Sequence, residues 1–272
     1  MQVRAKKSLG QHFLIDKNIA RDIVNSLKAT NVSKILEIGP GMGVLTNFLL
    51  ENENYETYVI EIDHESVNYL HKHFPQLKDR IIEGDFLKLD LAASISDQPF
   101  ALIGNLPYNI SSQIFFKVLE NKELVPEIVC MLQKEVAKRI CSGPGSKVYG
   151  ILSVFLQAWY NVEYLIDVPE YVFDPPPKVQ SAVIRLTANG RTDLGCDEKL
   201  FFKVVKTAFN QRRKMLRNSI KSFSLRIEEL DAVLLTRRPE QLSVSEFVEL
   251  TNNIEILLQN GILPNITDVE VE

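Results

Sequence analysis

The tetrapeptide Asn105-Leu106-Pro107-Tyr108 follows an apolar run, residues 100–104, that is typical of a buried strand. Its amide side chain, its proline-fixed backbone and its aromatic ring are the groups needed to hold the exocyclic amine of a nucleobase. Asn105 can accept one hydrogen bond from such an amine, and the backbone of Leu106 or Pro107 can accept another. Tyr108 can stack on the base. The tetrapeptide therefore predicts a site for amine methylation; the structural alternative is a strand that simply ends at a proline.

A Pro-rich segment offers a second wall for the same base. Residues 173–181 begin with Phe173-Asp174-Pro175-Pro176-Pro177, and such a stiff segment could present the Phe173 ring to a base. Taken alone, the segment is more often a rigid connection between two strands.

Three glycines at alternate positions, Gly39, Gly41 and Gly43, follow the strand expected over residues 34–38. Glycine lets the backbone turn sharply and approach a ligand closely. A dinucleotide-binding fingerprint would have a further glycine at position 44, where this chain has Val44, and the acid that precedes the loop would repel phosphate. The loop therefore favours a nucleoside ligand without phosphate, over a glycine turn that serves packing alone.

Acidic residues end the next two strands. Glu61, followed by Ile62, stands about 20 residues after the glycine loop, where a carboxylate accepts hydrogen bonds from ribose hydroxyl groups. Asp85 can accept from an adenine amino group, while Phe86 flanks the ring. Because the carboxyl ends of parallel strands meet at one edge, these groups should share a site. An adenosyl ligand without phosphate implies S-adenosylmethionine, whose sulfonium cation tolerates acidic surroundings.

Short β-rich runs alternate with helical patterns through most of the chain. The expected strands are residues 34–38, 57–62, 80–83, 100–104, 127–132, 162–168 and 182–186. This alternation predicts an α/β fold with a mostly parallel, doubly wound sheet, and the Pro-rich link between the last two runs predicts an antiparallel end. A polar linker separates residues 1–188 from residues 195–272, whose apolar periodicity is helical. We expect a catalytic domain followed by a small helical domain.

Composition argues against several classes of function. Lys and Arg total 31 against 35 Asp and Glu, a net charge of −4, so a polyanionic partner must meet local basic patches. The three cysteines form no CxxC pair and the four histidines lack metal-ligand spacing, so we expect neither disulfides nor a metal site. No apolar stretch reaches membrane-spanning length and no secretory signal is visible, so we expect a cytoplasmic protein without a membrane partner.

Together these segments resemble the KsgA branch of the rRNA adenine N6-dimethyltransferase family, whose members modify small-subunit rRNA. The resemblance covers nearly the whole chain. It rests on residues 7–14, 37–43, 59–63, 84–85, 104–111, 173–181 and 210–214. The family implies a Rossmann-like class I methyltransferase sheet, a small C-terminal helical domain and S-adenosylmethionine as the cofactor.

The resemblance also assigns roles to single residues. The implied cofactor-binding set is His12, Leu14, Gly39, Gly41, Glu61, Ile62, Asp85, Phe86 and Asn105. The implied catalytic set is Asn105, Leu106, Pro107, Tyr108 and Phe173. His12 and Leu14 should close over the cofactor, and Asn105 should bridge cofactor and target. Many relatives carry Asn in place of His12, and either polar side chain can serve there.

The family's substrate is a pair of adjacent adenosines in the loop of the 3′-terminal hairpin of 16S rRNA, each dimethylated at N6. A single-stranded loop suits an enzyme that must extrude a base. We expect 16S rRNA of the immature small subunit as the partner, a role in ribosome biogenesis, and a monomer. The residues expected to bind RNA are Lys6, Lys7, Arg212, Arg213 and Lys214. The last three belong to a basic run, residues 211–221. If this run is a helix, its charges are spread around much of the helix surface, and some of them only face solvent.

Three alternatives compete with this assignment. The related Erm type methylates an adenosine of large-subunit rRNA, but Leu106 and the sizeable helical C-terminal region resemble the small-subunit branch more. A non-catalytic assembly factor could use the same scaffold, although the intact acceptor segment and acidic strand ends argue against lost catalysis. A DNA adenine methyltransferase fits less well, since its acceptor motif usually begins with an acid or carries Pro-Pro.

Overall fold

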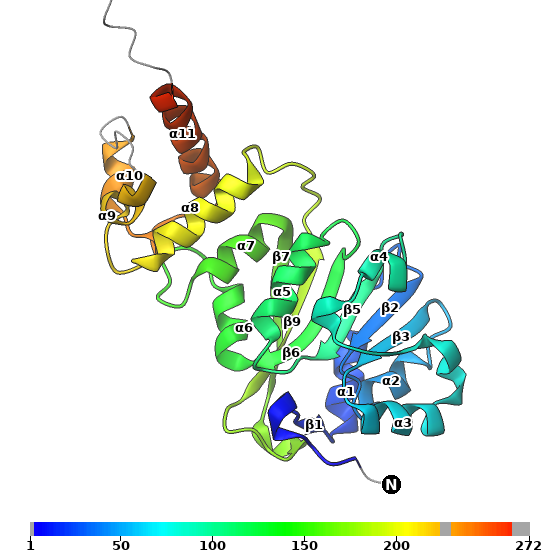
Figure 1. Cartoon of the computed structure of the whole chain (residues 1–272). Helices are drawn as coiled ribbons and strands as arrows, with labels where there is room; N and C mark the ends of the chain where they lie inside the picture. Colours follow the sequence, from blue (N-terminus) through cyan, green and yellow to red (C-terminus); the bar gives the residue numbers. More distant parts are fainter. Residues whose placement is uncertain (1–2, 224–229, 263–272) are drawn as a thin grey trace, which may run out of the picture. The chain divides into compact units, whose positions relative to one another are not determined.

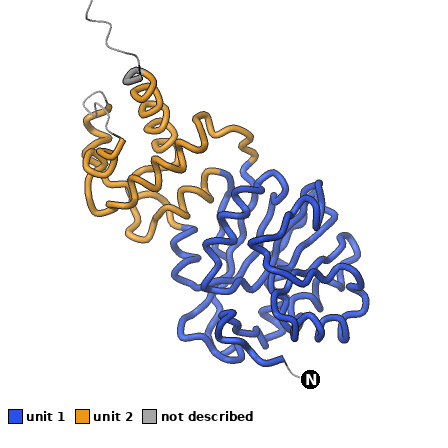
Figure 2. The backbone as a smooth tube through the Cα atoms, in the orientation of Figure 1, with its two compact units in different colours: residues 1–141, 159–189 blue, residues 142–158, 190–272 orange. Residues whose placement is uncertain are grey.

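The structure, a computed structural model, describes residues 3–223 and 230–262 and divides into two compact units (Figures 1 and 2). The first unit is built from residues 1–141 and 159–189, and the second from residues 142–158 and 190–272. The rest of the chain, including the end of the expected helical domain, lies outside the described residues. No helix in the described ranges is long and apolar enough to cross a membrane.

The first unit is organised around a seven-stranded sheet. Its strands are β2 (Lys34–Ile38), β3 (Glu56–Glu61), β4 (Ile81–Glu83), β5 (Ala101–Asn105), β6 (Glu127–Gln133), β7 (Tyr160–Val168) and β9 (Ser181–Ala188). They lie in the order β4-β3-β2-β5-β6-β9-β7, parallel from β4 to β6, with β9 antiparallel to both of its neighbours. The predicted doubly wound sheet, its antiparallel end and all seven expected strands are confirmed, with ends that shift by at most two residues.

The inner strands are buried on both faces, which explains their continuous apolar sequences. All of β2 except Lys34 is buried, as are β5 up to Gly104 and β6 up to Leu132. The helices of this unit flank the sheet (Figure 1). They are α1 (Lys17–Asn25), α2 (Val44–Leu49), α3 (His64–His73), α4 (Leu91–Ser94), α5 (Ser111–Glu120) and α6 (Lys134–Cys141), with 3-10 turns at Lys7–Leu9, Pro75–Arg80, Phe86–Lys88 and Glu170–Val172.

The strand order reverses between β2 and β5, where open α/β sheets bind their ligands. The glycine loop leaves β2 at this point, and Asn105 ends β5 beside it. The two strands come unusually close here, because a Cβ atom added at Gly104 would lie 2.5 Å from the carbonyl oxygen of Ile38. Glycine at position 104 therefore sets how near Asn105 comes to the loop.

A second, two-stranded sheet was not predicted from the sequence. β1 (Phe13–Leu14) pairs antiparallel with β8 (Phe173–Asp174), placing Leu14 opposite Phe173. Two-residue strands leave no periodic signal, and their residues lie far apart in the chain. This pairing joins the N-terminal segment to the Pro-rich segment.

The second unit is helical. Its helices are α7 (Ile151–Trp159, of which residues 151–158 belong here), α8 (Glu198–Asn210), α9 (Leu216–Ser219), α10 (Ala232–Thr236) and α11 (Val244–Ile262), with 3-10 turns at Ile220–Phe223 and Pro239–Gln241. Aromatic rings form its core: the centroids of Phe209 and Phe247 lie 5.9 Å apart, and those of Phe155 and Phe201 lie 6.1 Å apart.

The structure corrects the sequence-based expectations for this region at two points. Residues 142–158 belong to the second unit instead of to a continuous domain 1–188, because Tyr149 and Phe155 pack against the aromatic residues of α8. The basic run 211–221 is not one helix: α8 ends at Asn210, and a turn over residues 211–215 precedes α9.

We expect Gly104→Ala to lower the free energy of unfolding by about 2–3 kcal/mol, because the added methyl group meets backbone atoms that cannot move aside. Urea denaturation measures this loss. The matched control is Gly84→Ala, where an added Cβ would meet nothing within 4 Å, and which should change stability by about 0.5 kcal/mol or less. Equal stabilities of the two variants would contradict the close approach of β2 and β5.

The buried carboxyl of Glu37 gives a second prediction. Burial raises its pKa from 4.5 to about 8, and the Thr46 hydroxyl donates to it at 2.5 Å. Between these two pH values the folded chain holds a proton that the unfolded chain releases, so stability should fall as pH rises, by at most about 1.4 kcal/mol per pH unit. Glu37→Gln should flatten this fall in denaturation curves from pH 5 to pH 8, whereas the exposed Glu51→Gln should not. Parallel pH profiles for Glu37→Gln and the wild type would count against the assignment.

Candidate functional site

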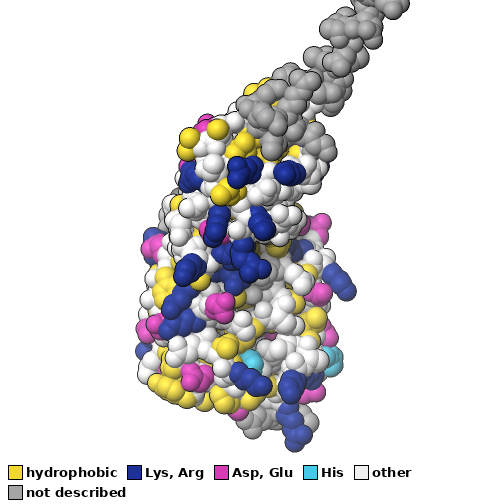
Figure 3. Space-filling view, turned by 90° about the vertical axis from the view of Figure 1, so that its left-hand side faces the viewer, with side chains coloured by type: hydrophobic (Ala, Val, Ile, Leu, Met, Phe, Trp, Pro, Cys, Tyr) yellow, Lys and Arg dark blue, Asp and Glu magenta, His cyan; other side chains and the backbone are white. Residues whose placement is uncertain are grey.

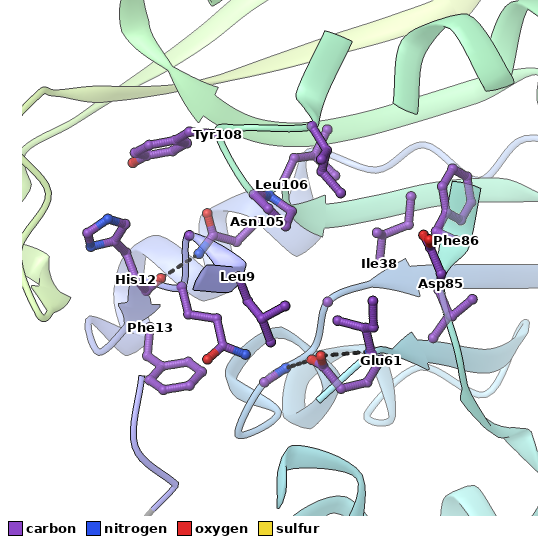
Figure 4. A pocket seen from close by; sticks show the side chains of 18 of the residues that line it. Leu9, His12, Phe13, Ile38, Glu61, Asp85, Phe86, Asn105, Leu106 and Tyr108 are labelled. Carbon is purple, nitrogen blue, oxygen red and sulfur yellow. Dashed lines mark hydrogen bonds between the residues drawn. The ribbon is translucent and has the colours of Figure 1, made fainter. Parts of the chain in front are cut away.

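A cleft lies over the carboxyl ends of β2, β3, β4 and β5, and Figure 4 shows it from close by. The space between atoms in the cleft is about 720 Å³, part of it open to solvent. The structure brings most of the predicted site residues to its walls: His12, Gly39, Gly41, Glu61, Ile62, Asp85, Phe86, Asn105, Leu106, Pro107 and Tyr108. Asp85 and Phe86 lie at one end of the cleft, and His12 and Tyr108 lie at the other (Figure 4).

The glycine loop has the backbone conformation that requires glycine. Gly39, Gly41 and Gly43 have φ angles of 66°, 56° and 78°, in the left-handed region that other residues rarely adopt. At Gly41 an added Cβ would come within 2.8 Å of the Phe13 ring. The loop therefore passes directly beneath the N-terminal segment.

The carboxylate of Glu61 holds this loop in place. One oxygen, Oε2, accepts from the backbone N–H of Gly41 at 3.0 Å, and the other accepts from Ile62 and Asp63 at 2.9 Å each. Burial raises the pKa of Glu61, and these backbone hydrogen bonds oppose that rise. A carboxylate has about four acceptor positions, so Glu61 keeps capacity for one more donor from a ligand.

The far end of the cleft is built by the turn after β4. The Asp85 carboxylate accepts from the backbone N–H of Leu87 at 3.0 Å, which orders the turn. Phe86 is buried, and the Lys117 ammonium lies 5.9 Å from the centroid of its ring. Ile62 is 52% exposed, so it presents an apolar wall rather than a core contact.

At the other end, Asn105 is oriented by the N-terminal segment. Its amide nitrogen donates to the backbone oxygen of His12 at 2.9 Å, and no hydrogen bond to its Oδ1 is found within the described chain. Figure 4 shows this oxygen on the side of Tyr108. Because the nitrogen is engaged, the amide presents an acceptor to the cleft.

The Tyr108 ring is held from two sides. Its hydroxyl forms a hydrogen bond with the buried Ser181 at the start of β9, and the His12 ring stacks on it with centroids 5.7 Å apart. The Nδ1 atom of His12 lies 2.7 Å from the backbone oxygen of Pro175. The sequence predicted that the Pro-rich segment, residues 173–181, lies beside the same base as Tyr108, but it gave no role to Ser181 at the end of that segment.

Two predicted site residues do not line this cleft. Phe173 is 2% exposed and packs in the core under β1, so the structure does not present its ring to a ligand as expected. Its pairing with Leu14 explains the burial, because both side chains point into the same apolar cluster. Leu14 instead lines a smaller neighbouring cavity that shares Phe13, Gly39 and Asn105 with the cleft.

The predicted RNA-binding residues of the first unit differ from each other. Lys6 pairs with the buried Asp63 and lies 3.2 Å from a carboxylate oxygen of Glu65, so it already has partners. Lys7 is exposed, and its side chain makes no ion pair with any described residue.

In the second unit, Arg212 is also engaged: it donates to the backbone oxygen of Lys147, and its Nε lies 3.6 Å from Glu240. Arg213 and Lys214 are exposed in the turn after α8, with no ion pair to other described residues. Lys and Arg side chains are numerous on the face that Figure 3 presents.

No group of three or more His, Cys, Asp or Glu side chains in the described ranges is placed to hold a metal ion. The charge at the cleft is acidic: Glu61 and Asp85 line it, and no lysine or arginine is among its described lining residues. The walls therefore suit a neutral or cationic ligand.

Known proteins resemble this chain in both sequence and fold. The family described as "Ribosomal RNA adenine dimethylase" matches residues 2–256. The chain is 58% identical over 259 residues to "Ribosomal RNA small subunit methyltransferase A" of Phocaeicola vulgatus, covering 95% of this chain and 92% of that protein. It is 59% identical over 252 residues to the protein of the same name from Cytophaga hutchinsonii, covering 92% and 97%.

Solved structures agree on the fold. A dimethyladenosine transferase from Plasmodium falciparum superposes with a TM-score of 0.75 at 22% identity, over 92% of this chain and 98% of that one. The 23S rRNA methyltransferase ErmE superposes with a TM-score of 0.65 at 23% identity, over 89% and 99%. The expected Rossmann-like methyltransferase fold is thereby confirmed. With a family match over nearly its whole length and relatives well above half identical, the chain belongs to the ribosomal RNA adenine dimethylase family.

Proposed function

We propose that this protein dimethylates N6 of two adjacent adenosines in the 3′-terminal hairpin loop of 16S rRNA, with S-adenosylmethionine as the methyl donor. The observation that carries the proposal is the orientation of Asn105. Its nitrogen donates to the backbone oxygen of His12, and its oxygen is left as an acceptor beside an aromatic ring at one end of the cleft.

The cleft suits the proposed cofactor. Backbone at Gly39 allows close approach, Glu61 has acceptor capacity for ribose hydroxyl groups, and Asp85 lies at the far end with Phe86 for the adenine. The lack of lysine and arginine among the described lining residues disfavours a phosphate-bearing ligand and favours a sulfonium cation. When bound, S-adenosylmethionine supplies the methyl group.

The residues of the chain prepare the target amine. Asn105 Oδ1 accepts one N–H, and the carbonyl of Leu106 or of Pro107 accepts the other. The Leu106 carbonyl is favoured, because one lone pair of the Pro107 carbonyl already accepts from Ile110 at 3.2 Å. Two acceptors draw the nitrogen lone pair out of conjugation and stabilise the charge that forms on alkylation. The alkylated nitrogen then loses its proton to water.

Tyr108 holds the base in position. Its ring is fixed by Ser181 and His12, so stacking costs little additional order. Burial raises the pKa of Tyr108, and the hydrogen bond with Ser181 opposes that rise.

The relatives suggest the substrate. Proteins 58% and 59% identical to this chain are named small-subunit rRNA methyltransferases. We propose that a monomer acts in the cytoplasm on the immature small subunit, with methyl transfer in the first unit and RNA contacts in the second, including Arg213 and Lys214. Because a 23S rRNA methyltransferase has the same fold, large-subunit rRNA is the alternative substrate.

The proposal predicts where methyl groups appear. Undermethylated small subunits and, separately, large subunits are incubated with the protein and labelled S-adenosylmethionine, and modified adenosines are mapped. We expect label on two adjacent adenosines of the 3′-terminal loop. Label on the large subunit alone would show that large-subunit rRNA is the substrate instead. Binding to the small subunit without any label would favour a non-catalytic assembly factor.

Removal of the acceptor tests the mechanism. Asn105→Ala should lower the methylation rate about 100-fold or more, because one acceptor for the developing charge is lost. Asn47→Ala, an exposed asparagine on α2, serves as the matched control and should keep the wild-type rate. Full activity of Asn105→Ala would overturn the role of Asn105.

Salt dependence tests the RNA contacts of the second unit. We expect the double variant Arg213→Ala/Lys214→Ala to bind rRNA more weakly and to reduce the slope of log affinity against log salt by about 1.4–1.8, because two phosphate contacts are lost. The control Lys72→Ala/Lys199→Ala removes two other exposed charges and should keep the slope. An unchanged slope in the first variant would exclude these contacts.

A further inference from the structure

The N-terminal segment supplies one wall of the cleft. Residues 9–13 all line it, and Phe13 packs over the glycine loop at Gly41. The cleft is therefore complete only when this segment is docked on the edge of the sheet. The segment has little secondary structure of its own, a single 3-10 turn and the two residues of β1, so it is held by the backbone pairing of β1 with β8 and by side-chain contacts.

Its charged anchor is Lys6. The Lys6 ammonium forms an ion pair with Asp63, whose side chain is 1% exposed, and the Lys6 backbone N–H donates to the Gln11 side chain at 2.8 Å. The Gln11 amide in turn lies 3.5 Å from the second oxygen of Asp63. Lys6 and Gln11 thus bracket the start of the lining residues and converge on one buried carboxylate.

Asp63 is directly connected to the cofactor end of the cleft. Its backbone N–H donates to Glu61, and its side chain accepts from the N–H of Glu65 and the hydroxyl of Ser66 at the start of α3. Burial alone would raise the pKa of Asp63, but hydrogen bonds from Lys6 and Ser66 outweigh it and hold the pKa below its usual value. Two buried carboxylates therefore lie side by side, and Lys6 is the cation that pairs with one of them.

We propose that Lys6 is a positioning residue of the cofactor site: by pairing with Asp63 it fastens residues 7–14 over the cleft, and it does not bind RNA phosphate. The proposal rests on the proposed function for the identity of the cofactor. Loss of the ammonium would leave the Asp63 carboxylate buried beside Glu61 without its cation, and the segment would be held less firmly against the edge of the sheet.

The test compares Lys6→Ala with Lys7→Ala in the full-length protein. Lys7 is the matched control, since it is an exposed neighbouring lysine without an ion pair to described residues. Calorimetry should show S-adenosylmethionine binding weakened about tenfold in Lys6→Ala and unchanged in Lys7→Ala. The salt slope of rRNA binding should stay at the wild-type value in Lys6→Ala, whereas the methylation rate at saturating cofactor should also fall, because the segment orients Asn105 through the His12 backbone oxygen. Lys6→Arg, which keeps the charge, should restore cofactor affinity.

A double variant distinguishes the docking of residues 7–14 through the Lys6–Asp63 ion pair from a general loss of stability. If Lys6 acts through Asp63, adding Asp63→Asn to Lys6→Ala should recover part of the lost cofactor affinity, because the uncompensated charge is removed. No recovery, or an unchanged cofactor affinity in Lys6→Ala, would overturn the proposal. A salt slope of rRNA binding lowered by about 0.7–0.9 in Lys6→Ala would show instead that Lys6 contacts phosphate.

Amide hydrogen exchange distinguishes this proposal from the proposed function. Residues 7–14 should exchange faster in Lys6→Ala than in Lys7→Ala without any ligand present, since the segment is less firmly docked. A wild-type protein that binds no S-adenosylmethionine would refute the proposed function. The exchange rates would still show whether Lys6 docks residues 7–14. Equal exchange rates of residues 7–14 in the two variants would refute the docking role of Lys6.

Discussion

One buried carboxylate, that of Glu61, is the interaction on which the site depends. It binds backbone N–H groups of the glycine loop after β2 and of the residues that follow β3. Together with the backbone hydrogen bond from Gly39 to the Ile60 carbonyl at 2.9 Å, it ties the glycine loop to the end of the next strand. The cost of burying the charge is offset by these three donors, and the remaining acceptor capacity is what a ligand can use.

A series of contacts connects this carboxylate with Asn105 and Tyr108. Asp63, bound to Glu61 through its backbone, holds Lys6 and with it the N-terminal segment. That segment places the backbone oxygen of His12 where it fixes the Asn105 amide, and the His12 ring where it flanks Tyr108. Glu61 and Asn105 are thus connected through the N-terminal segment by hydrogen bonds and the Lys6–Asp63 ion pair.

The two units use different means of stabilisation. The first relies on strands that are buried on both faces, and the polar groups of its cleft lie at the carboxyl edge of the sheet. The second relies on aromatic packing between helices, with Phe155 and Phe201 or Phe209 and Phe247 in contact. Basic side chains such as Arg213 and Lys214 stand on a turn of this second unit.

The sequence by itself determined the sheet, its antiparallel end, the glycine loop and the acidic strand ends, because each depends on local periodicity or on the meeting of parallel strands at one edge. The tertiary structure alone decided the partner of Lys6, the burial of Phe173 against Leu14, and the transfer of residues 142–158 to the second unit. These features depend on contacts between residues far apart in the chain, for which local patterns carry no signal.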